Sequence, residues 1–179
     1  MKRLLSLSLL LPFLFCSLSC KKTKEKVDEL TEFDISYSNN ISVPSQTMSM
    51  NVPVDFTTPD VPTQSVSKFS EHKTTEDLVS EIKFTKMRVS VSSGNLDFLK
   101  SLSVYVKASG VGEQLIATKN PIPTGLTTLD LDLQDVNIKN FIIQPNIQFR
   151  VTVTIDASTL AGQTLNLAET AHVKATLIK

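Results

Sequence analysis

The chain has 179 residues, with 18 Lys and Arg against 18 Asp and Glu, so its formal net charge is zero. It has no Trp and only two Tyr, and it shows neither the basic stripe nor the aromatic platforms that proteins use to bind nucleic acid. The length favours one domain with a sizeable core, and the composition excludes nucleic acid as an expected partner.

The first 20 residues have the layout of an export signal. Lys2 and Arg3 form a short positive region, and the 17 positions from Leu4 to Cys20 carry no charge. Several serines and Pro12 interrupt this run, whereas a membrane-spanning helix needs roughly 20 predominantly apolar residues. We therefore expect a cleaved signal peptide.

The residues Ser17-Leu18-Ser19-Cys20 resemble the lipobox of bacterial lipoproteins, which usually has Leu where this chain has Ser17. The resemblance implies that residues 1–19 are a lipoprotein signal peptide and that Cys20 is the lipidation site, with diacylglycerol on its sulfur and a further acyl chain on its amino group. Two or more acyl chains hold a protein stably at a membrane. An ordinary secretory signal, in which Cys20 has no such role, stays open as the alternative. Cys16 is the poorer candidate, because bulky Leu14 and Phe15 precede it.

Residues 20–33 form a charged segment that we interpret as a lipid-anchored tether to a domain over residues 34–179. No cysteine follows Cys20, so we expect neither a disulfide framework nor a thiol nucleophile in the domain. Surface-exported lipoproteins of some Gram-negative bacteria carry acidic residues after the anchor, whereas this chain has Lys21, Lys22 and Lys24. We therefore expect the cell envelope, at the outer membrane facing the periplasm, and leave surface exposure open.

The first part of the domain has irregular strand patterns. Residues 33–38 and 48–56 are expected strands, the second at an edge or a bulge because Pro53 lacks a backbone N–H. Residues 53–77 are rich in Pro, Thr and Ser and are expected to be a long loop that is mobile or covers an edge. Residues 81–91 alternate through Phe84 and resume on the opposite parity at Met87, which predicts a β-bulge.

The second part alternates apolar and polar residues with a period of two, which predicts half-buried strands over 101–108, 128–134, 146–156 and 172–178. Short helical turns are expected over 74–79 and 135–142, capped by Thr74 and Asp135. Turn residues separate the strands. Together these features predict an all-β fold, an antiparallel β-sandwich of seven to nine strands that is immunoglobulin-like or related.

Asp130, Asp132 and Asp135 form the one acidic cluster worth weighing as a metal site. Calcium needs six to eight oxygen ligands, and ordinary strand alternation explains the first two aspartates, so calcium binding is the weaker interpretation. His72 and His172 have no second His or Cys at zinc-ligand spacing, and we expect His172 to face solvent or pair with an exposed acid. No catalytic motif or cofactor signature is present, so the sequence does not predict an enzyme.

Two functions follow from these features. The first is a membrane-anchored, non-catalytic lipoprotein whose sandwich binds or supports other envelope proteins through loops or an unpaired strand edge. The second is a periplasmic carrier of lipid or a small apolar ligand, which would need a cavity between the sheets.

Overall fold

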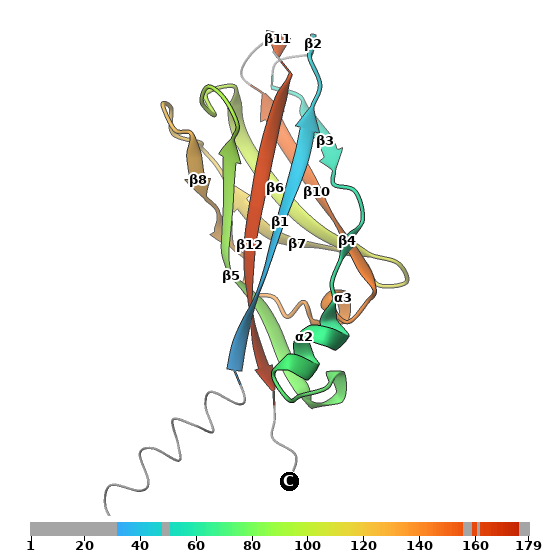
Figure 1. The fold of residues 1–179 in the computed structure, drawn as a ribbon. Coiled ribbons are helices and arrows are strands. Elements are labelled where there is room, and N and C mark those ends of the chain that lie inside the picture. The colour runs from blue at the N-terminus through green and yellow to red at the C-terminus, as the bar shows by residue number, and fades with distance from the viewer. Residues whose placement is uncertain (1–31, 48–50, 156–158, 161, 176–179) are drawn as a thin grey trace, which may run out of the picture.

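The computed structural model describes residues 32–47, 51–155, 159–160 and 162–175, and shows two antiparallel sheets packed face to face (Figure 1). The four-stranded sheet has, in spatial order, β1 (Glu32–Val43), β12 (Gln163–Ala175), β5 (Val79–Val91) and β8 (Thr128–Asp130). The six-stranded sheet has β3 (Pro53–Thr57), β10 (Asn146–Ile155), β6 (Leu99–Ala108), β7 (Gly112–Lys119) and β9 (Asp132–Leu133), with β4 (Val61–Pro62) also pairing with β10. β2 (Gln46–Thr47) and β11 (Thr159–Leu160) form a small separate pair. The sandwich predicted from the sequence is therefore confirmed.

The connectivity is that of a jelly roll. Eight of the described strands have three or more residues, namely β1, β3, β5, β6, β7, β8, β10 and β12. In chain order, the first of these pairs with the last, the second with the seventh, the third with the sixth and the fourth with the fifth. This nesting of hairpins divides eight strands between two sheets in the manner of a jelly roll. It separates the fold from immunoglobulin domains, within the broader group of sandwiches that the sequence indicated.

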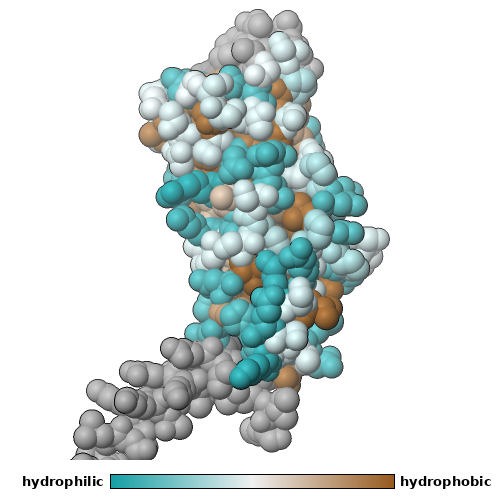
Figure 2. Space-filling view, in the orientation of Figure 1, coloured by the Kyte–Doolittle hydropathy of each residue, from teal (hydrophilic) through white to brown (hydrophobic). Residues whose placement is uncertain are grey.

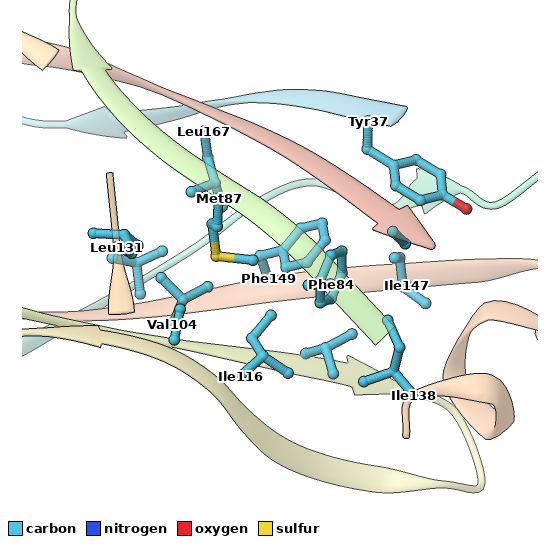
Figure 3. Close-up of a cluster of buried hydrophobic side chains, with 14 of the residues drawn as sticks. Tyr37, Phe84, Met87, Val104, Ile116, Leu131, Ile138, Ile147, Phe149 and Leu167 are labelled. Atoms are coloured by element: carbon cyan, nitrogen blue, oxygen red, sulfur yellow. The ribbon is translucent and has the colours of Figure 1, made fainter. Parts of the chain in front are cut away.

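Alternating apolar residues from both sheets fill the space between them. Phe149, Val104 and Leu167 are fully buried, and Figure 3 shows side chains from the two sheets meeting in one layer. The rings of Phe84 and Phe149, one from each sheet, lie 6.2 Å apart between centroids. This continuous core stabilises the domain without a cysteine among residues 32–175.

Three short helical elements complete the described fold: α2 (Ser65–Glu71), the 3₁₀ helix η1 (Glu76–Leu78) and α3 (Lys139–Ile142). The two expected helical turns are present, but neither expected cap is used: η1 follows Thr75 rather than Thr74, and α3 follows Ile138 rather than Asp135. The Asn137 side chain accepts a hydrogen bond from the Lys139 N–H instead. A polar side chain two residues before the amide can satisfy it as well as a formal cap can.

Residues 53–77 were expected to form a loop, and this was only partly right. They contain the edge strand β3, the short strand β4 and α2. Pro53 lies on an edge strand, which is one of the two alternatives expected for it. Phe69 of α2 is buried and meets Phe33 edge to face, with ring centroids 6.3 Å apart. The segment therefore covers the side of the sandwich, and one buried aromatic side chain fixes it there.

Several strands differ from the expected ones. The expected strand 128–134 is divided between β8 in one sheet and β9 in the other, and β1 continues to Val43, beyond the expected end at residue 38. β12 begins at Gln163, nine residues before the expected start at His172. β7 was not expected, because Ile116 and Ala117 are both buried at a register shift and break the alternation. The bulge predicted in residues 81–91 is confirmed: Phe84 and Lys86 have consecutive partners on β12, which leaves Thr85 as the extra residue.

Candidate functional site

The chain enters the domain at the end that carries α2. Glu32 begins β1 opposite Lys174, near the end of β12, so both ends of the described domain lie together (Figure 1). Cys20 and most of the expected tether lie outside the described residues. β1 starts two residues before the expected domain boundary, and Phe33 is already buried. Any attachment through the N-terminal segment therefore acts on this end of the molecule.

A polar hollow of about 290 Å³ lies between β1 and α2. The Lys68 ammonium donates a hydrogen bond to the Ser36 carbonyl over 3.4 Å and lies 4.8 Å from the centre of the Tyr37 ring. Partial burial lowers the pKa of Lys68, and the charge of Glu71 acts in the opposite direction. Lys68 thus fastens α2 to the edge of β1, which accounts for the hollow as a packing feature.

Both histidines lie at this same end, although a hundred residues separate them in the sequence. The His72 ring stacks on Phe33, with centroids 3.9 Å apart. His172 lies on the outer face of the sheet, where its Nδ1 is 2.8 Å from Asp34 Oδ1. The expected pairing of His172 with an exposed acid is confirmed. His72 contacts Phe33 on the inward face of β1, whereas His172 contacts Asp34 on the outward face of the same strand.

Glu169 is the feature that sequence reasoning missed. It lies on the inward face of β12, is only 2% exposed, and receives hydrogen bonds of 3.3 Å to both carboxyl oxygens from the Asn39 side chain. Tyr37 lies directly opposite on β1, and its hydroxyl donates instead to the Thr63 carbonyl. The sequence does contain a signal for this buried acid. In the alternating stretch 165–173, Glu169 occupies one of the positions that are otherwise apolar and inward-facing.

Burial raises the pKa of Glu169 to about 8, against the weaker stabilisation of the carboxylate by Asn39. Burial raises the pKa of Tyr37 as well, and the charge of Glu169 adds to this effect. An amide is a neutral partner and cannot offset the cost of a buried negative charge as a cation would. The carboxyl group is therefore kept protonated at neutral pH inside the core. It does not line the polar hollow between β1 and α2.

The structure separates the three aspartates of the candidate calcium site. Asp130 ends β8 in the four-stranded sheet, whereas Asp132 begins β9 in the six-stranded sheet, so the chain crosses between sheets at Leu131. Each carboxylate has its own cation: Asp130 pairs with Arg88 at 2.7 Å, Asp132 with Lys119 at 3.0 Å and Asp135 with Lys83 at 2.7 Å. Among the described residues, no three His, Cys, Asp or Glu side chains are grouped so that they could hold a metal ion.

The outer face of the six-stranded sheet carries a fixed arginine. Arg150 stacks on the Tyr105 ring at 4.0 Å and donates hydrogen bonds to Glu113 over 2.8 Å and to Asp55 over 3.0 Å. The pKa of Glu113 is lowered, chiefly by its hydrogen bond with Arg150. The two acids neutralise the charge of the Arg150 guanidinium. Its hydrogen bonds to them connect β10 with β3 and β7 on the solvent-exposed face of the sheet.

In the part of the chain that the structure describes, no helix has the length and apolar character needed to cross a membrane.

Comparison with known proteins gives no family. No family model matches the chain, and no curated protein matches it. Among solved structures, a chain of Desmodium yellow mottle tymovirus is 12% identical with a TM-score of 0.31, over 83% of this chain and 90% of that chain. A chain of turnip yellow mosaic virus is 10% identical with a TM-score of 0.26, over 82% of this chain and 97% of that chain. These scores are too low to carry any argument about function.

Proposed function

We propose that the protein is a membrane-anchored bacterial lipoprotein whose jelly-roll domain is a non-catalytic binding or structural module. The observation that carries the proposal is the sequence Ser17-Leu18-Ser19-Cys20 at the end of an uncharged run that follows Lys2 and Arg3. The start of β1 at Glu32 supports it, because the folded domain begins shortly after the proposed anchor. Residues 20–31 then form a spacer that reaches at most about 40 Å when extended.

The module is proposed to act through its surfaces rather than through chemistry. The polar groups described above are engaged with one another: Arg150 with two acids, the three aspartates with three cations, and Glu169 with Asn39. Buried apolar side chains from the two sheets form one core cluster (Figure 3). This packing favours a binding or structural role over the alternative role of an apolar-ligand carrier.

The test is the intact mass of the protein extracted from membranes of the expressing bacterium. We expect the mass of residues 20–179 plus a diacylglyceryl group and an N-acyl chain. Cys20→Ala should lose the lipid and leave the membrane fraction, whereas the matched control Cys16→Ala should behave as wild type because residue 16 is removed with the signal. An unmodified mature chain in the soluble fraction would overturn the anchor and leave a secreted protein.

A further inference from the structure

The backbone of β1 is open on one side. Three carbonyls of β12 accept hydrogen bonds from the β5 side: Thr164 from the Ser92 N–H, Thr170 from the Thr85 hydroxyl and Lys174 from the Ser80 hydroxyl. These residues lie opposite even-numbered residues of β1. In an antiparallel ladder the N–H and C=O of one residue point to the same side. The even-numbered residues of β1 therefore turn their backbone groups away from β12, toward the free edge.

The open part of this edge is short and symmetric. At one end, the Ser36 carbonyl is taken by Lys68, and at the other end Pro44 has no N–H to donate. Between them lie Ser38, Asn40 and Ser42, which are all exposed and have no backbone partner on that side among the described residues. Ser36 and Pro44, which limit the open part of the edge, each lie four residues from Asn40. We call Ser38–Ser42 the open window.

The other outermost strands in the described part of the fold are short. β8 has three residues and β9 has two, so neither offers a long ladder. The edge strand β3 starts with Pro53, and short β4 follows it along β10. Natural sheets commonly use short strands and proline to block pairing at an edge. The open window has no proline, lysine or bulge, and β1 is the longest of the outermost strands, with 12 residues.

The window suits a copy of itself. Its exposed side chains read Ser-Asn-Ser in either direction about Asn40, and none is charged. The Asn166 amide holds the Ser38 and Asn40 side chains on the outer face, at 3.2 and 3.0 Å. The acids Glu32 and Asp34 lie outside the window. Figure 2 shows a largely hydrophilic surface with scattered apolar residues on the side of the molecule where β1 lies, so association there would depend on backbone pairing.

We propose that the open window pairs antiparallel with the same window of a second copy of this chain, about a two-fold axis at Asn40. Ser38 then lies opposite Ser42 of the second copy, and Asn40 lies opposite its own equivalent. About six backbone hydrogen bonds form, and the two four-stranded sheets become one continuous sheet. A parallel pairing is disfavoured, because it would place Glu32 and Asp34 opposite their own equivalents, and like charges opposite each other destabilise a pair.

This inference rests on the proposed function in one respect. An edge contact of this size buries little surface, and confinement of both copies to one membrane raises their effective concentration. In an antiparallel pair the two copies of Glu32 lie at opposite ends. A two-fold axis perpendicular to the membrane therefore requires β1 to lie along the bilayer, and each spacer of residues 20–31 must reach down beside its domain.

The test is disulfide cross-linking of the full chain in bacterial membranes, with one Cys introduced at a time. Directly opposed residues have Cα atoms about 5.5 Å apart, within disulfide range. Asn40→Cys should give a covalent dimer under mild oxidation. Ser38→Cys and Ser42→Cys should each stay monomeric alone, because the Cα atom of each lies about 14 Å from that of its own equivalent. They should cross-link when the two variants are expressed together.

A second variant tests the contact itself. Asn40→Lys places like charges on the axis, so it should reduce the cross-link between Ser38→Cys and Ser42→Cys at least tenfold, while circular dichroism stays unchanged because residue 40 is exposed. Equal cross-linking of all single variants, or no cross-link at residue 40, would overturn the pairing. The distribution of the protein between membrane and soluble fractions tests the anchor independently. Cross-linked protein in the soluble fraction would contradict the anchor but leave the pairing intact.

Discussion

At the scale of single residues, Glu169 stands out because it is an acid in an apolar core with a neutral partner. Its pKa of about 8 in the folded domain is well above the ordinary value near 4.3 of the unfolded chain. The folded state therefore binds more protons than the unfolded state between these two values. The free energy of unfolding must fall as pH rises through this window, by about 1.4 kcal/mol per pH unit from this group alone.

We expect Glu169→Gln to remove this dependence. Glutamine keeps the shape, stays neutral, and its carbonyl can still accept the hydrogen bond from Asn39. Urea unfolding should show that the variant exceeds wild type in stability by about 3–4 kcal/mol at pH 7, and that the difference shrinks toward zero near pH 4.5. If the difference in the free energy of unfolding between the two proteins stayed constant from pH 5 to 8, this would contradict a buried carboxyl group that has no cationic partner.

At the scale of elements, the bulge in β5 shows how one extra residue keeps a strand in place. Phe84 and Met87 are both buried, although three positions separate them, because Thr85 is left out of the ladder with β12. The bulge lets one apolar face serve both halves of a strand of 13 residues. The change of parity was visible in the sequence, and the pairing explains it.

Deletion of Thr85 should therefore be tolerated. Phe84 and Met87 would then share one parity in an unbroken ladder, so we expect a loss of no more than about 1 kcal/mol in the free energy of unfolding. Deletion of Lys83 is the matched control, because it can close the ladder only by turning Phe84 outward, at a cost of about 3 kcal/mol or more. Chemical denaturation of both variants measures this. Similar losses in the free energy of unfolding of the two variants would show that the strand does not tolerate a deletion better at the bulge than elsewhere.

At the scale of the whole molecule, the jelly-roll connectivity decides which polar groups meet. The crossing at Leu131 sends Asp130 and Asp132 to different sheets, and each finds a separate cation. Conversely, residues far apart in the sequence meet across β1 and β12, as Asn39 and Glu169 do. Contacts between the two ends of the described domain follow from the pairing of β1 with β12.

The calcium interpretation can be tested at this scale. We expect the midpoint of thermal unfolding to be the same in millimolar calcium and in chelator, because six to eight oxygens cannot converge from carboxylates that separate ion pairs hold apart. Sodium chloride at matched ionic strength is the control, since salt weakens the ion pairs themselves. A rise of more than about 2 °C that only calcium produces would refute this account.

The sequence by itself determined the all-β class, the inward faces of β6 and β10, the bulge of β5 and the restriction of Pro53 to an edge or a bulge, because a period of two and the chemistry of proline act locally. It also carries the whole case for the anchor at Cys20. The connectivity, the separation of Asp130 from Asp132, the burial of Glu169 and the open edge of β1 came only with the tertiary structure. Strand order depends on which distant segments pair, and the environment of a side chain depends on what the second sheet places against it, neither of which is encoded in local periodicity.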